Sequence, residues 1–289
     1  MRRIVLSGAG GFLGRYIVRE AEKRNVPVLA VTTQPEMFGE KTETLDTAMF
    51  LEGKSTLSES DVFIHCLFPT NADGGKMACG LKAAFSLIKA ARNAGAGAFI
   101  NISSQSVYAS KREAPASEKT PLSLETPYAV GKFSTEVFTN EVFDGVPHTN
   151  VRLASLLGVE YKQRIVNRMI VQALNGEPLK VVGGMQRYGF LDVRDAAEGL
   201  VKLALSDAKI WEEIYNLGRN EIYTLIHVAD CIVSEMKNQT GADVSYSILE
   251  GQDNRNSAVD ASLFMKTFNW TPTVDLSETI ATIICSNMT

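Results

Sequence analysis

The feature that most constrains the fold of this chain is a glycine-rich turn close to its amino terminus. Gly8, Gly11 and Gly14 stand three residues apart, between a short apolar run and an amphipathic segment typical of a helix. The first glycine permits a tight turn, the second leaves room for a pyrophosphate, and the third lets the helix pack closely. Backbone N–H groups at the helix start, around Phe12 and Leu13, favour phosphate. The turn predicts a dinucleotide-phosphate site, and its place at the first strand–helix junction disfavours a glycine turn without a ligand.

The alternation of strands and helices after this turn predicts an α/β fold. Strands are expected at residues 3–6, 26–32, 62–67, 98–102 and 149–153, and helices at 11–24, 76–93 and 128–140. A parallel sheet with helices on both faces has this order, and right-handed crossovers make it doubly wound, as in Rossmann-type domains. Further along, Asp195 is positioned to cap a helix over residues 196–205.

We expect two lobes that are interleaved along the chain of 289 residues. Residues 1–158 are predicted to form a dinucleotide-binding domain, to which residues 189–217 return. Residues 159–188 and 218–289 are predicted to form a smaller carboxyl-terminal α/β lobe that binds the substrate. No repeat, low-complexity tract or linker separates the two lobes.

The charge and the cysteine content exclude several classes of partner. The chain has 29 Lys and Arg against 33 Asp and Glu, a net charge of −4, and no basic stripe, so nucleic acid is not expected. No apolar stretch approaches the ~20 residues that cross a bilayer. Three dispersed histidines and four scattered cysteines give no zinc site, and free thiols suit a reducing compartment. We therefore expect a cytoplasmic protein that binds neither a metal nor a membrane.

A tyrosine and a lysine four residues apart supply the candidate acid–base chemistry. Tyr128 and Lys132 fall on one face of an expected helix. A free tyrosine titrates near ~10, so it needs a nearby cation to act near neutral pH, and Lys132 supplies that charge. Upstream, the hydroxyls of Ser104 and Ser106 follow a buried strand end, where parallel sheets expose functional groups. Such a hydroxyl can donate to a carbonyl oxygen as negative charge develops there.

Together these residues resemble the extended short-chain dehydrogenase/reductase family, also called the NAD-dependent epimerase/dehydratase family. The GxxGxxG spacing is typical of that superfamily, and the resemblance covers nearly the whole chain. The matching segments are Asp61 to His65, Ser103-Ser104 with Val107-Tyr108, Pro127 to Lys132 with Glu136, Val151 to Leu153 with Gly158, Phe190 to Val193 with Asp195, Tyr215 to Gly218, and Trp270 with Pro272. Within these segments, Phe63 stands where valine is usual in the family, and Gly131 where serine is usual.

The resemblance assigns roles to the candidate catalytic residues. It implies that Tyr128 is the general acid and base, and that Lys132 modulates the tyrosine pKa and anchors a ribose. Ser104 becomes the donor to the substrate oxygen rather than Ser103, because it stands four residues before Tyr108. The implied reaction is hydride transfer at the nicotinamide ring, coupled to proton transfer through the tyrosine.

The same resemblance implies a homodimer. In the family, the helices expected at 76–93 and 128–140 pair with their copies in a second subunit. These helices carry apolar residues beyond the need of one sheet face, including Phe85, Ile88, Phe133 and Val137. In the alternative, all these side chains point at the sheet and the protein is a monomer.

The expected cofactor site contains Gly8, Gly11, Phe12, Leu13, Gly14, Thr32, Leu67 and Lys132. The end of the second strand, near Thr32, lacks the carboxylate that usually holds the ribose 2′-hydroxyl of NAD. No arginine follows directly to bind a 2′-phosphate, although Arg15 and Lys41 are candidates. We therefore expect NADP in preference to NAD, and NAD is the alternative.

The expected substrate site contains Ser104, Ser106, Tyr128, Ser155 and Arg187. Dehydratases of the family carry an Asp-Glu pair after the catalytic hydroxyl, whereas Gln105 and Ser106 stand here, so dehydration is not expected. Arg187 precedes Phe190 by one residue more than the usual diphosphate-binding arginine. Either Arg187 serves through an insertion, or Tyr188 takes its place and the contact is lost.

These features lead to an expected function and its alternatives. We expect an NAD(P)-dependent oxidoreductase that reduces the 4-keto group of a nucleotide-linked deoxy sugar. A nucleotide-sugar epimerase with tightly bound NAD, or a reductase of a non-sugar ketone or aldehyde, is the enzymatic alternative. A non-catalytic dinucleotide sensor is an alternative from another class, and such proteins typically lose the tyrosine or the lysine, both of which are present here.

Overall fold

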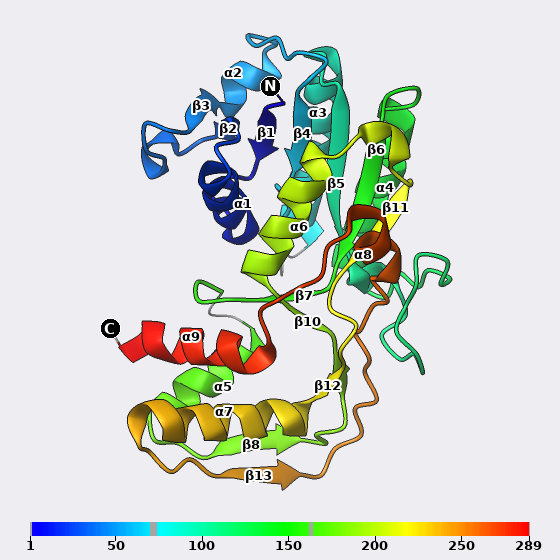
Figure 1. The fold of residues 1–289 in the computed structure, drawn as a ribbon. Helices are drawn as coiled ribbons and strands as arrows, with labels where there is room; N and C mark the ends of the chain where they lie inside the picture. Colours follow the sequence, from blue (N-terminus) through cyan, green and yellow to red (C-terminus); the bar gives the residue numbers. More distant parts are fainter. Residues whose placement is uncertain (1, 70–73, 162–163, 289) are drawn as a thin grey trace.

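A seven-stranded parallel sheet forms the centre of the larger lobe (Figure 1). The structure is a computed structural model that describes residues 2–69, 74–161 and 164–288. In order across the sheet, the strands are β11 (Ile214–Leu217), β6 (His148–Leu153), β5 (Ala98–Ser104), β4 (Val62–His65), β1 (Ile4–Ser7), β2 (Val28–Thr32) and β3 (Glu43–Asp46). The chain first moves from β1 to β3 and then from β4 to β11, so the direction switches between β1 and β4. Ligands bind at the carboxyl ends of strands at such a point.

Helices cover both faces of the sheet because alternate strand residues point to opposite sides. In β1, Ile4 and Leu6 belong to one apolar core and Val5 to the other. On the first face lie α1 (Phe12–Lys23) and α6 (Val193–Leu205), and on the second lie α2 (Thr47–Leu51), α3 (Gly74–Asn93) and α4 (Pro127–Val142). This arrangement confirms the doubly wound fold that the sequence predicts.

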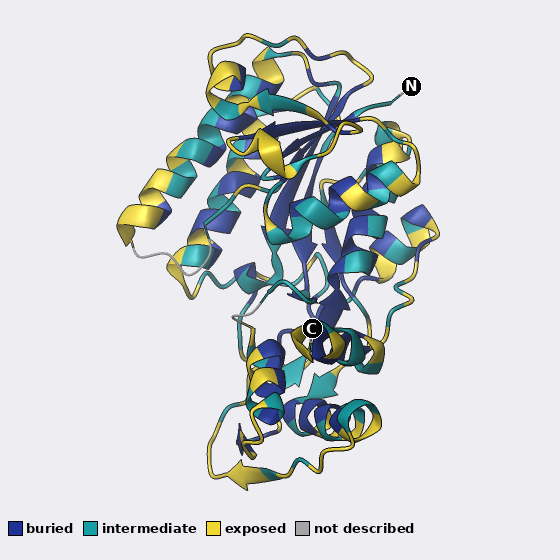
Figure 2. Cartoon of the chain, turned by 90° about the vertical axis from the view of Figure 1, so that its left-hand side faces the viewer, coloured by how far each residue is buried: buried dark blue, intermediate teal, exposed yellow. Residues whose placement is uncertain are grey.

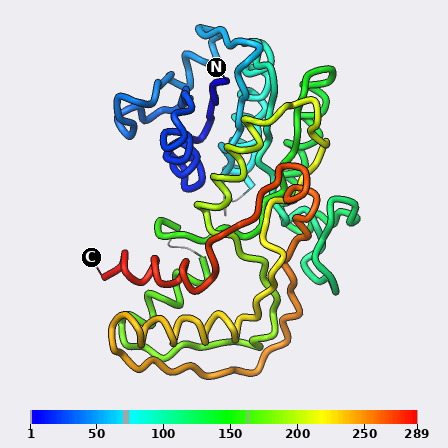
Figure 3. Tube along the Cα trace, in the orientation of Figure 1, coloured from blue at the N-terminus to red at the C-terminus, as the bar shows by residue number. Residues whose placement is uncertain are grey.

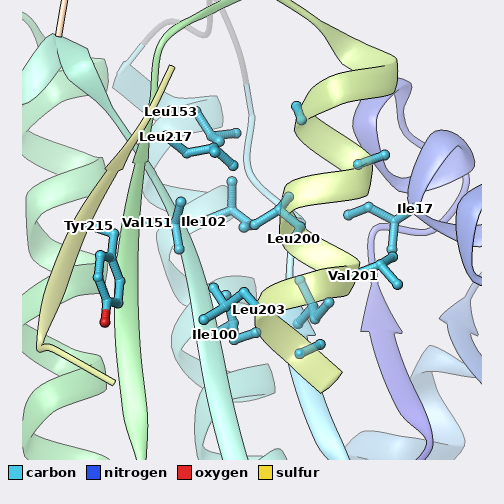
Figure 4. Packing of buried hydrophobic residues seen from close by; sticks show 14 of the residues in the cluster. Ile17, Ile100, Ile102, Val151, Leu153, Leu200, Val201, Leu203, Tyr215 and Leu217 are labelled. Carbon is cyan, nitrogen blue, oxygen red and sulfur yellow. The ribbon is translucent and has the colours of Figure 1, made fainter. Parts of the chain in front are cut away.

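Helix α6 is fixed to the sheet although it comes late in the chain. In Figure 4, Leu200 and Leu203 lie toward Ile102 and Ile100 of β5, while Ile17 of α1 lies on the other side of the helix. All five side chains are buried. Burying a side chain of this size contributes roughly 1.5–3 kcal/mol, so this packing holds α6 firmly on the dinucleotide-binding lobe.

The smaller lobe lies at one end of the sheet and has its own apolar core (Figure 1). Its elements are α5 (Ile165–Leu174), α7 (Leu225–Thr240), α9 (Leu276–Met288) and the parallel pair β8 (Leu179–Val182) and β13 (Tyr246–Leu249). The pair β7 (Ser155–Leu157) with β10 (Phe190–Asp192) contributes residues to the cores of both lobes. The pair β9 (Arg187–Tyr188) with β12 (Tyr223–Thr224) packs against the core of the smaller lobe. In Figure 2, the helices of both lobes are buried on their inner faces and exposed outside.

The chain crosses between the lobes more often than we expected. Figure 3 shows it rising from β13 to α8 (Ser262–Phe268), beside the sheet, before it returns to α9. Phe264, Phe268 and Trp270 belong to the apolar core of the sheet. By their packing, residues 262–270 therefore lie with the larger lobe, whereas the sequence analysis assigns them to the smaller one.

Helix α6 begins earlier than predicted. Asp192 is its N-cap, and its carboxylate accepts the backbone N–H of Arg194 at 2.8 Å. The predicted cap, Asp195, lies instead in the first turn, where it is buried and accepts the backbone N–H groups of Thr273 and Val274 at 3.1 and 2.9 Å. Asp195 therefore ties a distant loop to the helix start. Short 3-10 helices at Pro35–Met37, Gln105–Val107 and Ala208–Ile210 complete the elements.

The described residues show neither a membrane span nor a metal cluster. Within these ranges, every helix is too short or too polar to cross a bilayer. In the same part of the chain, no three His, Cys, Asp or Glu side chains are grouped as metal ligands. The four cysteines are free thiols.

Candidate active site

The glycine turn links β1 to α1 next to the end of β4. Gly8 has a φ of +74°, and a Cβ there would lie 2.8 Å from the backbone nitrogen of Leu67, so the position requires glycine. A Cβ at Gly14 would collide with the carbonyl group of Gly8, as expected for a close approach of the helix. Gly11 caps α1 and donates its N–H to the carbonyl oxygen of Gly8 at 3.0 Å. The turn presents bare backbone at a helix start, which suits a diphosphate.

The first cavity, of about 330 Å³, brings this turn together with the candidate catalytic residues. Of the predicted cofactor and catalytic residues, its lining includes Gly8, Gly11, Phe12, Leu13, Gly14, Ser104, Tyr128 and Lys132. The sequence analysis did not assign Phe68, Tyr161 and Arg164 to the site, and they also line it. One cavity therefore holds the glycine turn and the tyrosine–lysine pair, which lie more than a hundred residues apart in the sequence.

The second cavity, of about 180 Å³, extends from the glycine turn to the end of β2. Thr32 and Leu67 line it, together with Gln34 and Thr47, which the sequence analysis missed. Thr32 Oγ1 accepts the backbone N–H of Gln34 at 3.0 Å. This cavity lies where the rest of a dinucleotide would continue from a diphosphate at the turn.

The two cations considered for a 2′-phosphate lie outside the second cavity. Arg15 forms an ion pair with Glu160 at 2.6 Å, and Lys41 is exposed. Among the described residues that line this cavity, none carries a charge. The site therefore offers neither a carboxylate to a 2′-hydroxyl nor a cation to a 2′-phosphate.

Lys132 is held by burial and one short hydrogen bond. Its ammonium group donates to the carbonyl oxygen of Ile102 in β5 at 2.7 Å. Burial removes water from the charge and lowers the pKa of Lys132 to about 8, while Cys66 and Glu136 act in the opposite direction. The lysine is therefore charged below about pH 8 and loses its proton as the pH rises through that value.

Tyr128 and Ser104 meet at the same cavity. Burial raises the pKa of Tyr128 to about 12, and a hydrogen bond with Ser104 opposes that effect. The Lys132 ammonium lies 5.9 Å from the centre of the tyrosine ring. Burial, rather than the lysine charge invoked from the sequence, therefore dominates the pKa of this tyrosine in the free protein.

A buried ion pair fixes the helix that carries the catalytic pair. Glu136, one turn after Lys132 in α4, pairs with Arg152 of β6 at 2.7 Å, and each side chain is only 3% exposed. Ser103 donates to the same carboxylate, and Arg152 donates to the Tyr108 hydroxyl at 3.0 Å. These residues of the matching motifs therefore hold α4 against the sheet.

The third cavity, of about 460 Å³, shares Ser104 and Tyr128 with the first. Other predicted residues that line it are Ser106 and Ser155. The Ser106 hydroxyl donates to Ser104 at 3.0 Å. No carboxylate belongs to the lining of this cavity within the described ranges, and Gln105 occupies the place where a dehydratase would carry its acid. The cavity therefore offers hydroxyl and amide groups around the tyrosine.

Arg187 does not line the third cavity. Its guanidinium group donates to the backbone carbonyls of Glu113 and Arg112 at 2.8 and 3.1 Å, so it holds the loop that follows β5. The arginines that line the cavity are Arg164 and Arg255. No motif in the sequence distinguishes them, because each lies on a loop whose course depends on the folded lobes.

The comparison with known families now identifies the class of protein. The model of the family described as "NAD dependent epimerase/dehydratase family" matches residues 4–218, and the chain belongs to this family. It is therefore an enzyme of the NAD-dependent epimerase/dehydratase type, which argues against the non-catalytic sensor. Residues 4–218 include the glycine turn, Ser104, Tyr128 and Lys132.

Curated relatives and solved structures that are similar to this chain include several nucleotide-sugar enzymes. UDP-glucuronic acid decarboxylase 1 of Arabidopsis thaliana is 24% identical over 96% of this chain and 67% of its own length. A dTDP-glucose 4,6-dehydratase of Xanthomonas campestris is 25% identical over 63% of this chain, and the match spans only 55% of that protein. The structure of UDP-glucuronic acid 4-epimerase from Bacillus cereus, in complex with UDP-glucuronic acid and NAD, has a TM-score of 0.80 at 20% identity and covers 98% of both chains. That last likeness shows a shared fold.

Proposed function

We propose that the protein is a nucleotide-sugar 4-epimerase that uses retained NAD. The observation that carries this proposal is the position of Ser104 and Tyr128, which line both the cavity of the glycine turn and the third cavity. A cofactor in one cavity and a sugar in the other would therefore meet at the same hydroxyls. The NAD-dependent family supports this alternative better than 4-keto reduction, the reaction that the sequence analysis favoured.

The residues of the first cavity suit the cofactor. The bare glycine turn fits a diphosphate, because Cβ atoms at Gly8 and Gly14 would clash with the backbone around them. The Lys132 ammonium, charged below about pH 8, can donate to ribose hydroxyls. When bound, NAD would accept the hydride from the sugar carbon and later return it.

The proton is handled by the residues between the two cavities. With NAD bound, the phenolate form of Tyr128 would accept the proton of the sugar hydroxyl as the C4 hydrogen leaves as hydride, and the Ser104 hydroxyl would donate to the developing carbonyl oxygen. Return of the hydride to the opposite face of C4, with return of the proton from Tyr128 to the oxygen, would give the epimer with no net redox change. Formation of the phenolate requires a pKa below the value of about 12 in the free protein, and a positive charge nearby would lower it.

The third cavity suits an anionic nucleotide. Arg164 and Arg255 line it, and they replace Arg187 as our candidates for a substrate diphosphate. Elimination of water needs an additional acid and base, for which the described lining of this cavity offers no carboxylate. The arginines favour a nucleotide-linked substrate, and the lack of a carboxylate among the described lining residues disfavours 4,6-dehydration.

A variant set tests the substrate site. Arg255→Ala and Arg164→Ala should each raise the KM for a UDP-sugar by roughly tenfold or more, because a charge-assisted contact is lost. Arg168→Ala, on the exposed side of α5, is the matched control and should leave KM unchanged. A normal KM in both cavity variants would remove the diphosphate contact from the proposal.

A substitution at the end of β2 tests the cofactor. We propose NAD, since a 2′-phosphate would find no cation among the described residues of the second cavity. Thr32→Asp should weaken NADPH binding by roughly tenfold or more and spare NADH, because a carboxylate repels the phosphate and accepts from a 2′-hydroxyl. Fluorescence titration of both nucleotides measures this. Equal weakening of NADH and NADPH would place the 2′ position elsewhere.

We also propose a homodimer formed through α3 and α4. These helices pack side by side, with the rings of Phe85 and Phe138 4.4 Å apart, while Val130 and Val137 are 45% and 51% exposed. Phe133, by contrast, packs against the core of the sheet. A second copy would cover the exposed valines in an interface on the order of 1,600 Å².

Sedimentation at micromolar concentration tests the dimer. The protein should sediment at twice its chain mass of 31.5 kDa, and Val137→Glu should shift it toward the monomer, because the charge would be buried. Val182→Glu, on the exposed face of β8, is the control. A single species of chain mass for the unaltered protein would refute the dimer.

A further inference from the structure

An aromatic ring covers the catalytic lysine. Phe68 follows β4 and lines the first cavity, and the centre of its ring lies 4.3 Å from the Lys132 ammonium. The same ring meets Tyr128 edge to face, with the ring centres 5.8 Å apart. A cation over an aromatic face is attracted by the ring, and edge-to-face pairs are a favoured aromatic geometry. Phe68 therefore contacts both members of the tyrosine–lysine pair.

Room for this ring comes from Gly131, the residue before the lysine. A Cβ at Gly131 would lie 2.8 Å from Cζ of Phe68 and 3.0 Å from Sδ of Met77. Gly131 lies inside α4, near its amino-terminal end, where glycine destabilises a helix relative to alanine. It stands where the family pattern has serine. A larger residue would displace the ring, because both close atoms are the far ends of side chains.

We propose that Phe68 is a positioning residue for Tyr128 and Lys132, and that Gly131 is glycine in this protein because it leaves room for the Phe68 ring. This inference rests on the roles proposed above for the tyrosine and the lysine. In its place over the ammonium, the ring limits the directions from which water and ribose hydroxyls reach Lys132. Its edge-to-face contact with Tyr128 also restricts the position of the tyrosine ring.

The titratable groups around Lys132 are either neutral or already paired with another residue. At the end of β4, His65 and Cys66 lie near enough to feel the lysine charge. Both are neutral at ordinary pH, because burial lowers the pKa of the histidine to about 3 and raises that of the thiol to about 12. From α4, Glu136 acts on the lysine but is already paired with Arg152. Removal of the Phe68 ring would lose the cation–π attraction but would also admit water. Because burial is the main cause of the lowered pKa of Lys132, we expect the lysine to remain charged to higher pH.

The test is a double-mutant cycle read by NADH binding over a range of pH. Gly131→Ser should weaken NADH binding by roughly tenfold in the natural background, because the new side chain displaces the ring. It should have less than about a twofold effect in a Phe68→Ala background, where the flexible Met77 thioether can give way. In the natural protein, NADH binding should be lost as the pH rises through about 8, where Lys132 loses its proton. Phe68→Ala alone should move this loss to higher pH. Phe68→Leu, which still excludes water, should keep it near pH 8.

Two results would overturn the inference. Equal damage from Gly131→Ser with and without Phe68 would show that the two positions are not coupled. Gly131→Ala, with a smaller side chain, repeats the comparison if the serine variant folds poorly. Alternatively, the upper pH limit of Phe68→Ala could equal that of the natural protein. Failure of the proposed function gives a different result. Lys132→Met would then leave NADH binding unchanged, while the double-mutant cycle of positions 68 and 131, read by the midpoint of thermal unfolding, would still show coupling.

Discussion

Tyr128→Phe should lower turnover of the nucleotide sugar by about 10²-fold or more while NAD still binds. The substitution removes only the hydroxyl that exchanges a proton with the sugar, and leaves the ring that meets Phe68. The two quantities to measure are kcat with a nucleotide sugar and the affinity for NADH by fluorescence. The expected split is a large loss in kcat with little change in cofactor affinity.

The matched control is Tyr16→Phe. It makes the same chemical change on α1, where the tyrosine packs edge to face with Phe12 and does not line the first or third cavity. Its kcat should be close to that of the natural protein. Near-normal turnover of Tyr128→Phe would assign proton transfer to another group, of which Ser104 is the nearest candidate.

Glu136→Leu should reduce the free energy of unfolding by about 3–5 kcal/mol. The substitution leaves the Arg152 guanidinium buried without its carboxylate, with both side chains only 3% exposed in the natural protein. The remaining contact with the Tyr108 hydroxyl does not compensate for the lost charge. Urea unfolding followed by circular dichroism measures the difference.

Two further variants separate burial from charge. Glu136→Leu with Arg152→Leu should cost less than Glu136→Leu alone, because no uncompensated charge remains in the core. Asp243→Ala, which breaks the exposed Lys237–Asp243 pair, should leave stability nearly unchanged. If the double variant were no more stable than Glu136→Leu, packing and not charge would explain the loss.

The sequence predicts most of the larger lobe because its signals are local. The glycine spacing at Gly8, Gly11 and Gly14 marks one turn, and the buried strands β1 and β2 are short, mainly apolar runs. The edge strand β3 and the short helix α2 escaped prediction, since residues 43–46 are partly exposed and carry polar side chains. A run of apolar residues marks a buried strand, and a partly exposed edge strand has no such run.

The candidate site also contains residues that local spacing predicts and residues that it does not. Tyr128 and Lys132 are one helical turn apart, so their common face is readable from spacing. Arg164 and Arg255 line the third cavity from loops whose position depends on the folded lobes, and Phe68 lines the first cavity from the loop after β4. Arg187 shows the converse: a motif suggested a phosphate contact, but backbone carbonyls of a neighbouring loop engage its guanidinium group.

The most direct test of the central claim is proton NMR of nucleotide sugars incubated with the protein and a trace of NAD. The substrates are UDP-glucuronic acid, UDP-glucose, UDP-N-acetylglucosamine and dTDP-glucose, and absorbance at the NADH band is followed in parallel. The account predicts that at least one of them is converted into its C4 epimer, with many turnovers per NAD and no net accumulation of NADH. A product that has lost water or carbon dioxide, or no conversion of any nucleotide sugar, would contradict it.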